Sequence, residues 1–131
     1  EVERKFREFH VIPAAKELIF LHLLAHDFLN EERFSKSYAR GKFSIKKWGK
    51  QRIIRELKFR DISEYNIKTA LKEIDEAVYL TTIYDITEKR NALITEENSY
   101  KRRKKLTDFL LRKGYEFDLI YTTVKAVIES R

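Results

Sequence analysis

Only two side chains in this 131-residue chain have the type and spacing of metal ligands. His22 and His26 stand four residues apart, and on a helix this spacing can direct two imidazoles toward one ion. The sequence has no Cys, and no third His accompanies the pair. Ordinary packing or surface roles therefore explain both side chains more simply than a metal site does.

Paired carboxylates and glycines are the other candidates for chemistry. Glu31-Glu32 and Glu96-Glu97 lie at predicted helix ends, where compensation of the helix dipole explains them. The three isolated Gly residues cannot build a phosphate loop, a dinucleotide fingerprint or a nucleophile elbow. We therefore expect no enzymatic activity, no required metal and no cofactor.

Basic residues carry the stronger signal. The net charge of +7 and the pI near 9.5 indicate an anionic partner. The basic side chains concentrate in residues 40–60 and 101–113, whereas acids are spread mainly through residues 64–97. The candidate contacts in the first segment are Arg40, Lys42, Lys46, Lys47, Lys50, Arg52, Arg55 and Phe59. Those in the second segment are Lys101, Arg102, Lys104, Lys105 and Arg112.

The helix predicted over residues 50–60 is amphipathic. Its apolar face holds Ile53, Ile54 and Leu57. Arg52, Arg55 and Phe59 fall on the opposite face, at spacings of three and four. Arginine can bind phosphate or carboxylate through two hydrogen bonds, and an exposed Phe can stack on a base or enter a partner pocket. The alternative for Phe59 is packing against a neighbouring unit.

The helix predicted over residues 100–113 repeats this arrangement. Its core face holds Leu106, Phe109 and Leu110. Its other side holds Lys101, Lys104, Lys105 and Arg112. The five consecutive basic residues over 101–105 repel one another, so the run is tolerable when it faces solvent or an anion. A merely solvated face is the alternative to a binding site.

These helices belong to an all-helical pattern, which the scarcity of Gly and Pro favours. We predict helices over residues 1–9, 13–27, 30–42, 50–60, 63–74, 76–95, 100–113 and 117–128. Asn30 and Asp75 should cap the starts of two of them, and Ser63 with Asn66 partly resembles a capping box. Gly41 should end or loosen one helix, and Gly114 should form the left-handed C-cap of another.

An internal repeat joins these helices into three-helix units. The pattern Asn30-Glu31-x-x-Phe34 returns at Asp75, 45 residues later, and Leu57 through Ile67 returns at Leu110 through Ile120, 53 residues later. We predict a partial first unit over 1–29 that lacks its first helix, a second unit over 30–75 and a third over 76–131. Neighbouring units of this size must pack together to be stable.

Four motifs stand out in the second unit: Asn30-Glu31-Glu32-Arg33-Phe34, Tyr38-Ala39-Arg40, Trp48-Gly49 and Arg52-Ile53-x-x-Glu56-Leu57. Together they resemble the RecX family of small bacterial regulators of the RecA recombinase. The family layout of three tandem three-helix modules is similar too, and implies an elongated, curved array. The family usually has Gly after the second helix of each module, where this chain has His10, Asp61 and only once Gly114.

The resemblance implies that the chain binds the RecA–single-stranded DNA filament and represses recombinase, co-protease and ATPase activity. We expect the chain to act as a monomer. The alternative is a stand-alone DNA-binding protein in which one of the basic helices enters a groove. The longest apolar run, residues 18–25, is too short to cross a membrane, and the absence of Cys fits a reducing cytoplasm. The chain does not begin with Met, so we expect it to start inside a longer gene product.

Overall fold

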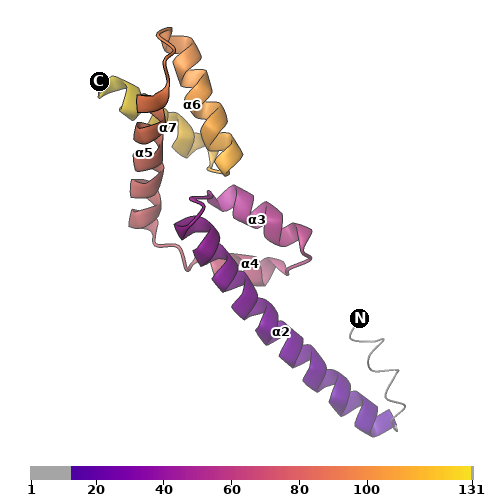
Figure 1. The fold of residues 1–131 in the computed structure, drawn as a ribbon. Coiled ribbons are helices and arrows are strands. Elements are labelled where there is room, and N and C mark those ends of the chain that lie inside the picture. The colour runs from indigo at the N-terminus through magenta and orange to yellow at the C-terminus, as the bar shows by residue number, and fades with distance from the viewer. Residues whose placement is uncertain (1–12, 131) are drawn as a thin grey trace. The chain divides into compact units, whose positions relative to one another are not determined.

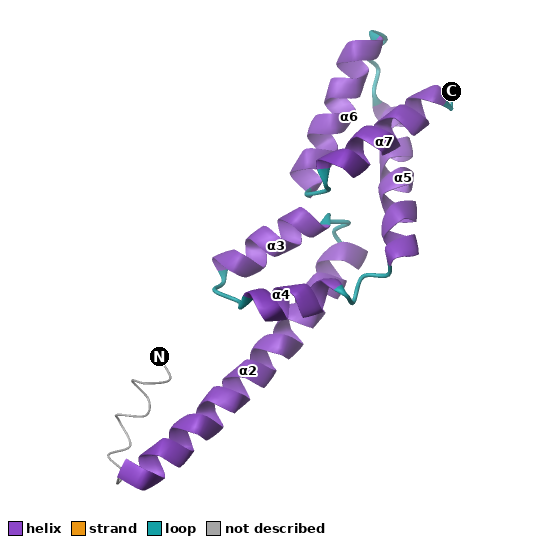
Figure 2. Ribbon diagram, turned by 180° about the vertical axis from the view of Figure 1, so that it is seen from behind, coloured by secondary structure: helices purple, strands orange, loops and turns teal. Residues whose placement is uncertain are grey.

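The computed structural model describes residues 13–130, and these residues contain helices and no strand (Figures 1 and 2). The helices are α2 (Pro13–Ser44), α3 (Lys50–Phe59), α4 (Glu64–Leu71), α5 (Glu76–Leu93), α6 (Ser99–Lys113) and α7 (Phe117–Glu129). The all-helical prediction is confirmed. The helix predicted over residues 1–9 lies outside the described residues.

The chain divides into two compact units, residues 1–34 and residues 35–131. Within the second unit, α3 packs along α4, and α7 packs against both α5 and α6. None of the described helices is both long and apolar enough to pass through a lipid bilayer.

Helix α2 corrects two predictions. The helices expected over 13–27 and 30–42 are one continuous helix, so Asn30 lies inside it and does not cap a new one. Gly41 does not end the helix either, because the helix continues to Ser44. Between Pro13 and Gly41 the sequence contains no Pro or Gly. One interior Asn costs well under about 1 kcal/mol of helix propensity, which is too little to break the helix.

The buried face of the second half of α2 lies one residue away from the aromatic pair Phe34 and Tyr38. Ser35, Ala39 and Phe43 are buried, whereas Phe34 is 45% exposed. Tyr38 packs only at the edge of the core. The repeat aligns Phe34 with Tyr79, but the two positions differ in burial, because Tyr79 is fully enclosed.

The second half of the repeat has the same geometry at both of its occurrences. Asp61 and Gly114 occupy equivalent positions, and both have a left-handed backbone, with φ of 59° and 97°. Beside them, the Ile62 N–H donates to the Leu57 carbonyl (3.1 Å) and the Tyr115 N–H donates to the Leu110 carbonyl (3.2 Å). The same hydrogen bond at both places shows that α3 and α6 end in the same way.

Local capping signals position the remaining helices. The Ser63 side chain accepts from the Asn66 N–H, and the Asp75 carboxylate accepts from the Val78 N–H, as the sequence predicted. The cap of α6 is Asn98, whose side chain accepts from the Lys101 N–H and which the sequence analysis missed.

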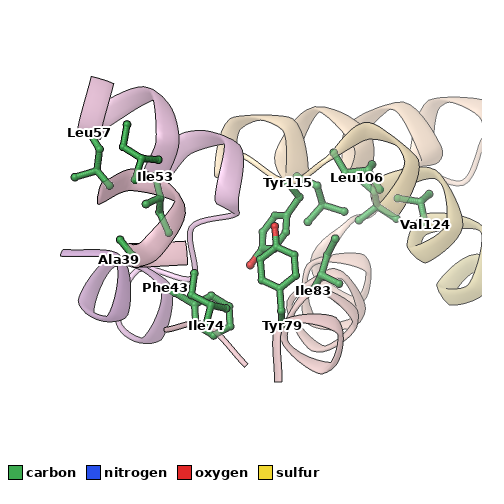
Figure 3. Close-up of a cluster of buried hydrophobic side chains, with 14 residues drawn as sticks. Ala39, Phe43, Ile53, Leu57, Ile74, Tyr79, Ile83, Leu106, Tyr115 and Val124 are labelled. Atoms are coloured by element: carbon green, nitrogen blue, oxygen red, sulfur yellow. The ribbon is translucent and has the colours of Figure 1, made fainter. Parts of the chain in front are cut away.

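Three aromatic rings join the two repeats within the second unit (Figure 3). The Tyr79 ring lies 5.7 Å from that of Phe43 and 5.3 Å from that of Tyr115, between ring centroids. The Tyr79 hydroxyl donates to the Glu116 carboxylate and accepts from the Lys50 N–H, and the Tyr115 hydroxyl donates to the Lys47 carbonyl. A core of large apolar rings with satisfied hydroxyls therefore lies between the repeats.

Leu57→Ala and Leu110→Ala should be equivalent lesions. Both side chains are fully buried at the same repeat position, beside the same helix ending. Each substitution should lower the free energy of unfolding by about 2–5 kcal/mol, as large-to-small core changes do. Urea unfolding monitored by circular dichroism measures both. A decrease below about 1 kcal/mol at either position would contradict the repeat alignment.

Candidate functional site

Helix α3 begins against the end of α6, and this contact decides which of its residues can face a partner. The Gly49 N–H donates to the Lys113 carbonyl (2.7 Å), and the Gln51 N–H donates to the Gly114 carbonyl (2.9 Å). The free N–H groups at the start of α3 thus meet the free carbonyl groups at the end of α6. The backbone at the start of α3 is therefore held against the end of α6.

Two of the three residues in the outward strip predicted on α3 are exposed. Arg55 faces solvent, and Phe59 is 84% exposed, so Phe59 does not pack against a neighbouring unit. Arg52 is half-buried instead. Its guanidinium lies 4.2 Å from the centre of the Trp48 ring and donates to the Arg112 carbonyl (3.1 Å). Arg52 therefore joins α3 to α6, which corrects its placement on the outer face.

Basic residues around the end of α2 also have partners within the chain. Arg40 forms an ion pair with Glu73 (2.7 Å), and the ammonium of Lys42 lies 5.0 Å from the centre of the Trp48 ring. The ammonium of Lys50 lies 3.0 Å from the Glu76 carboxylate. It also lies over the Tyr79 ring, 4.5 Å from its centroid. Lys42 and Lys50 are half-buried in these contacts, whereas Arg40 remains exposed.

The turn between α2 and α3 presents Lys46 and Lys47 to solvent. Lys47 has a left-handed backbone, with φ of 59°, and its ammonium donates to the Ser44 carbonyl (2.7 Å). The Lys46 carbonyl accepts from the ammonium of Lys113 (2.9 Å). The turn is therefore tied to the end of α6 while both of its own ammonium groups remain exposed.

The basic run at the start of α6 does not face one side. Arg102 turns inward, and its guanidinium donates to the Asn91 side chain (2.7 Å) and to the carbonyls of Asn91 and Ile94. It thereby satisfies the carbonyl groups at the end of α5, a structural task that the sequence analysis did not foresee. Lys104 lies 3.3 Å from the Asp108 carboxylate.

The remaining candidates on α6 are accessible. Lys101, Lys105 and Arg112 are exposed. The Lys105 ammonium lies 4.0 Å from the Glu96 carboxylate, which is a long distance for an ion pair. Exposed pairs of this kind contribute at most about 1 kcal/mol, so they do not prevent these side chains from binding an anion. The accessible candidates are thus Arg40, Lys46, Lys47, Arg55, Phe59, Lys101, Lys104, Lys105 and Arg112.

The structure adds basic residues that the sequence analysis missed. Lys113 points from the end of α6 toward Lys46 of the turn and Arg90 of α5. Partial burial, together with the positive charges of Arg52, Lys46 and Arg90, lowers the pKa of Lys113 below its ordinary value. Burial is the largest cause of this shift in pKa, and the neighbouring positive charges add to it.

His22 and His26 are both exposed on α2. Among the side chains that the structure describes, no three His, Asp or Glu residues gather as a metal-binding group.

Comparison with known families identifies the repeats. A family model described as RecX, second three-helix domain, matches residues 30–71. A model described as RecX, third three-helix domain, matches residues 77–124.

Named relatives and a solved structure agree with these matches. A regulatory protein RecX of Bacillus cytotoxicus is 24% identical over 100% of this chain and 48% of its own length. One of Clostridium botulinum (strain Eklund 17B) is 31% identical over 81% of this chain and 50% of its own length. The chain thus spans about half the length of these curated relatives. The crystal structure of RecX from Lactobacillus salivarius covers 95% of this chain and 81% of its own, with a TM-score of 0.72 and 21% identity.

Proposed function

Because the chain belongs to the RecX family, we propose that it regulates the RecA recombinase by binding the RecA–single-stranded DNA filament. Binding would repress the recombinase, co-protease and ATPase activities of RecA. The relatives named above are regulatory proteins, which supports this class of function. In this proposal the chain acts as a monomer in the cytoplasm, without a metal or cofactor of its own.

One structural observation carries the assignment to a surface. Arg55 and Phe59 stand one helical turn apart on the outer face of α3, and no residue of the described chain covers Phe59. Aromatic side chains and Arg are both enriched where proteins bind one another. We assign this pair to the RecA contact.

The basic residues of α6 would then meet the DNA phosphates. Lys101, Lys104 and Lys105 lie in the first two turns of α6 and are exposed. Their ammonium groups can move on long side chains, which suits the irregular backbone of a single strand. The two surfaces therefore differ in chemistry, and salt should distinguish them.

A stand-alone DNA-binding protein with α3 in a groove is less compatible with the geometry. A groove-reading helix usually contacts bases through its N-terminal half. The first turn of α3 is engaged with the end of α6, and Arg52 is held between Trp48 and the Arg112 carbonyl. Binding to naked single-stranded, naked duplex and RecA-coated DNA separates the two functions, because only the regulator prefers the coated strand.

Substitution of the exposed pair on α3 should weaken inhibition of RecA. Arg55→Glu combined with Phe59→Ala should raise the concentration needed for half-inhibition of the DNA-dependent RecA ATPase at least about tenfold, because each side chain should contribute about 1 kcal/mol to binding. Stability should change by at most about 0.5 kcal/mol per substitution, because both side chains are exposed. Lys125→Glu, on the exposed side of α7, is the matched charge control.

The α6 variant tests the assignment to phosphates. Lys101→Glu, Lys104→Glu and Lys105→Glu together should make the salt dependence of single-stranded DNA binding shallower, by about 0.7 in log–log slope for each phosphate that is no longer bound. If both multiple variants inhibit RecA as well as the parent chain does, the basic faces are only solvated and the proposed surfaces are wrong.

A further inference from the structure

A cavity of about 240 Å³ opens between α5, the end of α6 and the turn that follows α2. It lies within the second compact unit. Three apolar side chains and four cationic ones line it: Ile86, Leu93, Phe109, Lys47, Lys89, Arg90 and Lys113. No acidic, hydroxyl or amide side chain of the described chain is among them. The cavity therefore combines an apolar floor with an unneutralised basic rim.

The cations keep hydrogen-bond donors available for a ligand. Lys47 and Lys113 each give one donor to a backbone carbonyl, of Ser44 and Lys46 respectively. An ammonium group has three donors, so two remain on each. The rim thus favours an anion, and several anionic groups spaced around an apolar group would satisfy it best.

The floor argues against a nucleobase as that apolar group. A base carries both donors and acceptors on its edges, whereas the lining side chains offer donors only, at the rim. Burying the base edges in the floor would leave acceptors and donors without partners, which is costly. A base also cannot stack on the face of the Phe109 ring that Arg90 covers, because the Arg90 guanidinium lies 4.6 Å from the ring centroid.

We propose that this cavity binds an acidic peptide segment of a partner protein, with one large apolar side chain in the floor and flanking carboxylates on the rim. An aliphatic or aromatic side chain leaves no polar atom unpaired among Ile86, Leu93 and Phe109. Carboxylates on both sides of it accept from Lys89, Lys113 and their neighbours. The inference deepens the proposed function by naming the chemistry of one partner segment, and rests on that function only for the partner being a protein.

A short peptide probe tests the cavity directly. The probe is a fluorescein-labelled peptide in which one Phe is flanked on each side by two Asp, and binding is followed by fluorescence anisotropy with the full chain. Changing the Phe of the probe to Ala should weaken binding at least about tenfold, and so should changing its Asp residues to Asn. Lys89→Glu and Leu93→Ser in the protein should each weaken binding several-fold. Leu93 is 74% exposed, so its replacement leaves the core intact.

Matched controls separate the cavity from general charge and apolarity. Lys125→Glu makes the same charge change on α7, and Leu80→Ser makes the same apolar change on an exposed position of α5. Both should bind the peptide as the parent does. Equal binding of the peptide by all four variants would overturn the proposal. It would also be overturned if the Lys89→Glu and Leu93→Ser variants kept the peptide but no longer bound a labelled oligodeoxythymidine.

The RecA assay keeps this inference distinct from the proposed function. A parent chain that binds the peptide through the cavity but does not inhibit RecA overturns the proposed function and sustains the cavity site. A chain that inhibits RecA but shows no cavity-dependent peptide binding overturns the cavity site and sustains the proposed function.

Discussion

Gly114→Ala should lower the free energy of unfolding by about 4–7 kcal/mol. Gly114 has a φ of 97°, and an Ala there adds about 1–2 kcal/mol of left-handed strain. Its new Cβ would also lie 2.2 Å from the Arg52 Cβ and 2.6 Å from the Arg52 backbone nitrogen. Because backbone atoms cannot turn aside, α3 must move away from α6, which adds about 1–3 kcal/mol of overpacking.

The displacement would also break the hydrogen bonds of the junction. The donors Gly49 and Gln51 would no longer reach the carbonyls at the end of α6, at about 1 kcal/mol each. Gly49→Ala should have a similar effect without the strain, since its Cβ would lie 2.4 Å from the Gly114 backbone. Urea unfolding measures the decrease in stability, and faster amide hydrogen exchange at Gly49 and Gln51 should accompany it in the Gly114→Ala variant.

Gly41→Ala is the matched control for this substitution. Gly41 lies inside α2, and an added Cβ would meet no atom within 4 Å. Ala in a helix interior is favoured over Gly by about 1 kcal/mol, so this variant should be more stable than the parent. If Gly114→Ala costs less than about 1 kcal/mol, the two repeats do not meet through these glycines.

Features that depend on a few neighbouring residues are the ones that the sequence predicts well. Ser63 and Asp75 cap their helices, and Gly114 ends α6 in the left-handed conformation, because each signal acts within one helical turn. The same reasoning fails at Asn30. A cap residue only favours a helix start, and no residue between Pro13 and Asn30 ends the helix that begins at Pro13.

The candidate site is predicted less completely, because side-chain partners come from distant elements. Arg52 and Arg102 have the same sequence signature as exposed arginines, yet each donates to carbonyl groups that end another helix. The helical wheel places a residue on a face but does not show what packs against that face. Arg52 is therefore unsuitable for a charge reversal that must leave folding intact.

The basic-rimmed cavity is a second feature that cannot be predicted from the sequence. Lys89 and Arg90 lie in the acidic segment over 64–97, where the average composition conceals them. Folding brings them to Lys47 and Lys113, which come from the turn after α2 and the end of α6. Basic runs in the sequence indicate neither this grouping of four cations nor the apolar floor, because the floor comes from α5 and α6 together.

Alkaline pH should destabilise the chain steeply through Tyr79 and Tyr115. Burial, and for Tyr79 the hydrogen bond to Glu116, raises the pKa of each phenol well above its ordinary value. Above pH 10 the unfolded chain loses these protons while the folded chain keeps them, so unfolding becomes more favourable as pH rises. Each phenol contributes about 1.4 kcal/mol per pH unit, and the two together about 5 kcal/mol by pH 12.

Lys113 acts with the opposite sign over a lower range. Its pKa is lowered in the folded chain, so between that pKa and the unfolded value near 10.5 the unfolded chain binds more protons and stability rises with pH. This contribution is complete about one pH unit above 10.5. The effect of the tyrosines is therefore best measured as a difference between two chains that both contain Lys113, between about pH 10.5 and 12.

The decisive measurement is the free energy of unfolding in urea across that range, for the parent and for the Tyr79→Phe, Tyr115→Phe double variant. The double variant should be less stable at pH 8, because the Lys50 N–H and the Lys47 carbonyl lose their hydroxyl partners. Its slope above pH 10.5 should nevertheless be less steep by about 2.7 kcal/mol per pH unit, since neither ring can ionise. Equal slopes in the two chains would mean that both phenols already ionise in the folded state, and the enclosed aromatic contact between the repeats would be wrong.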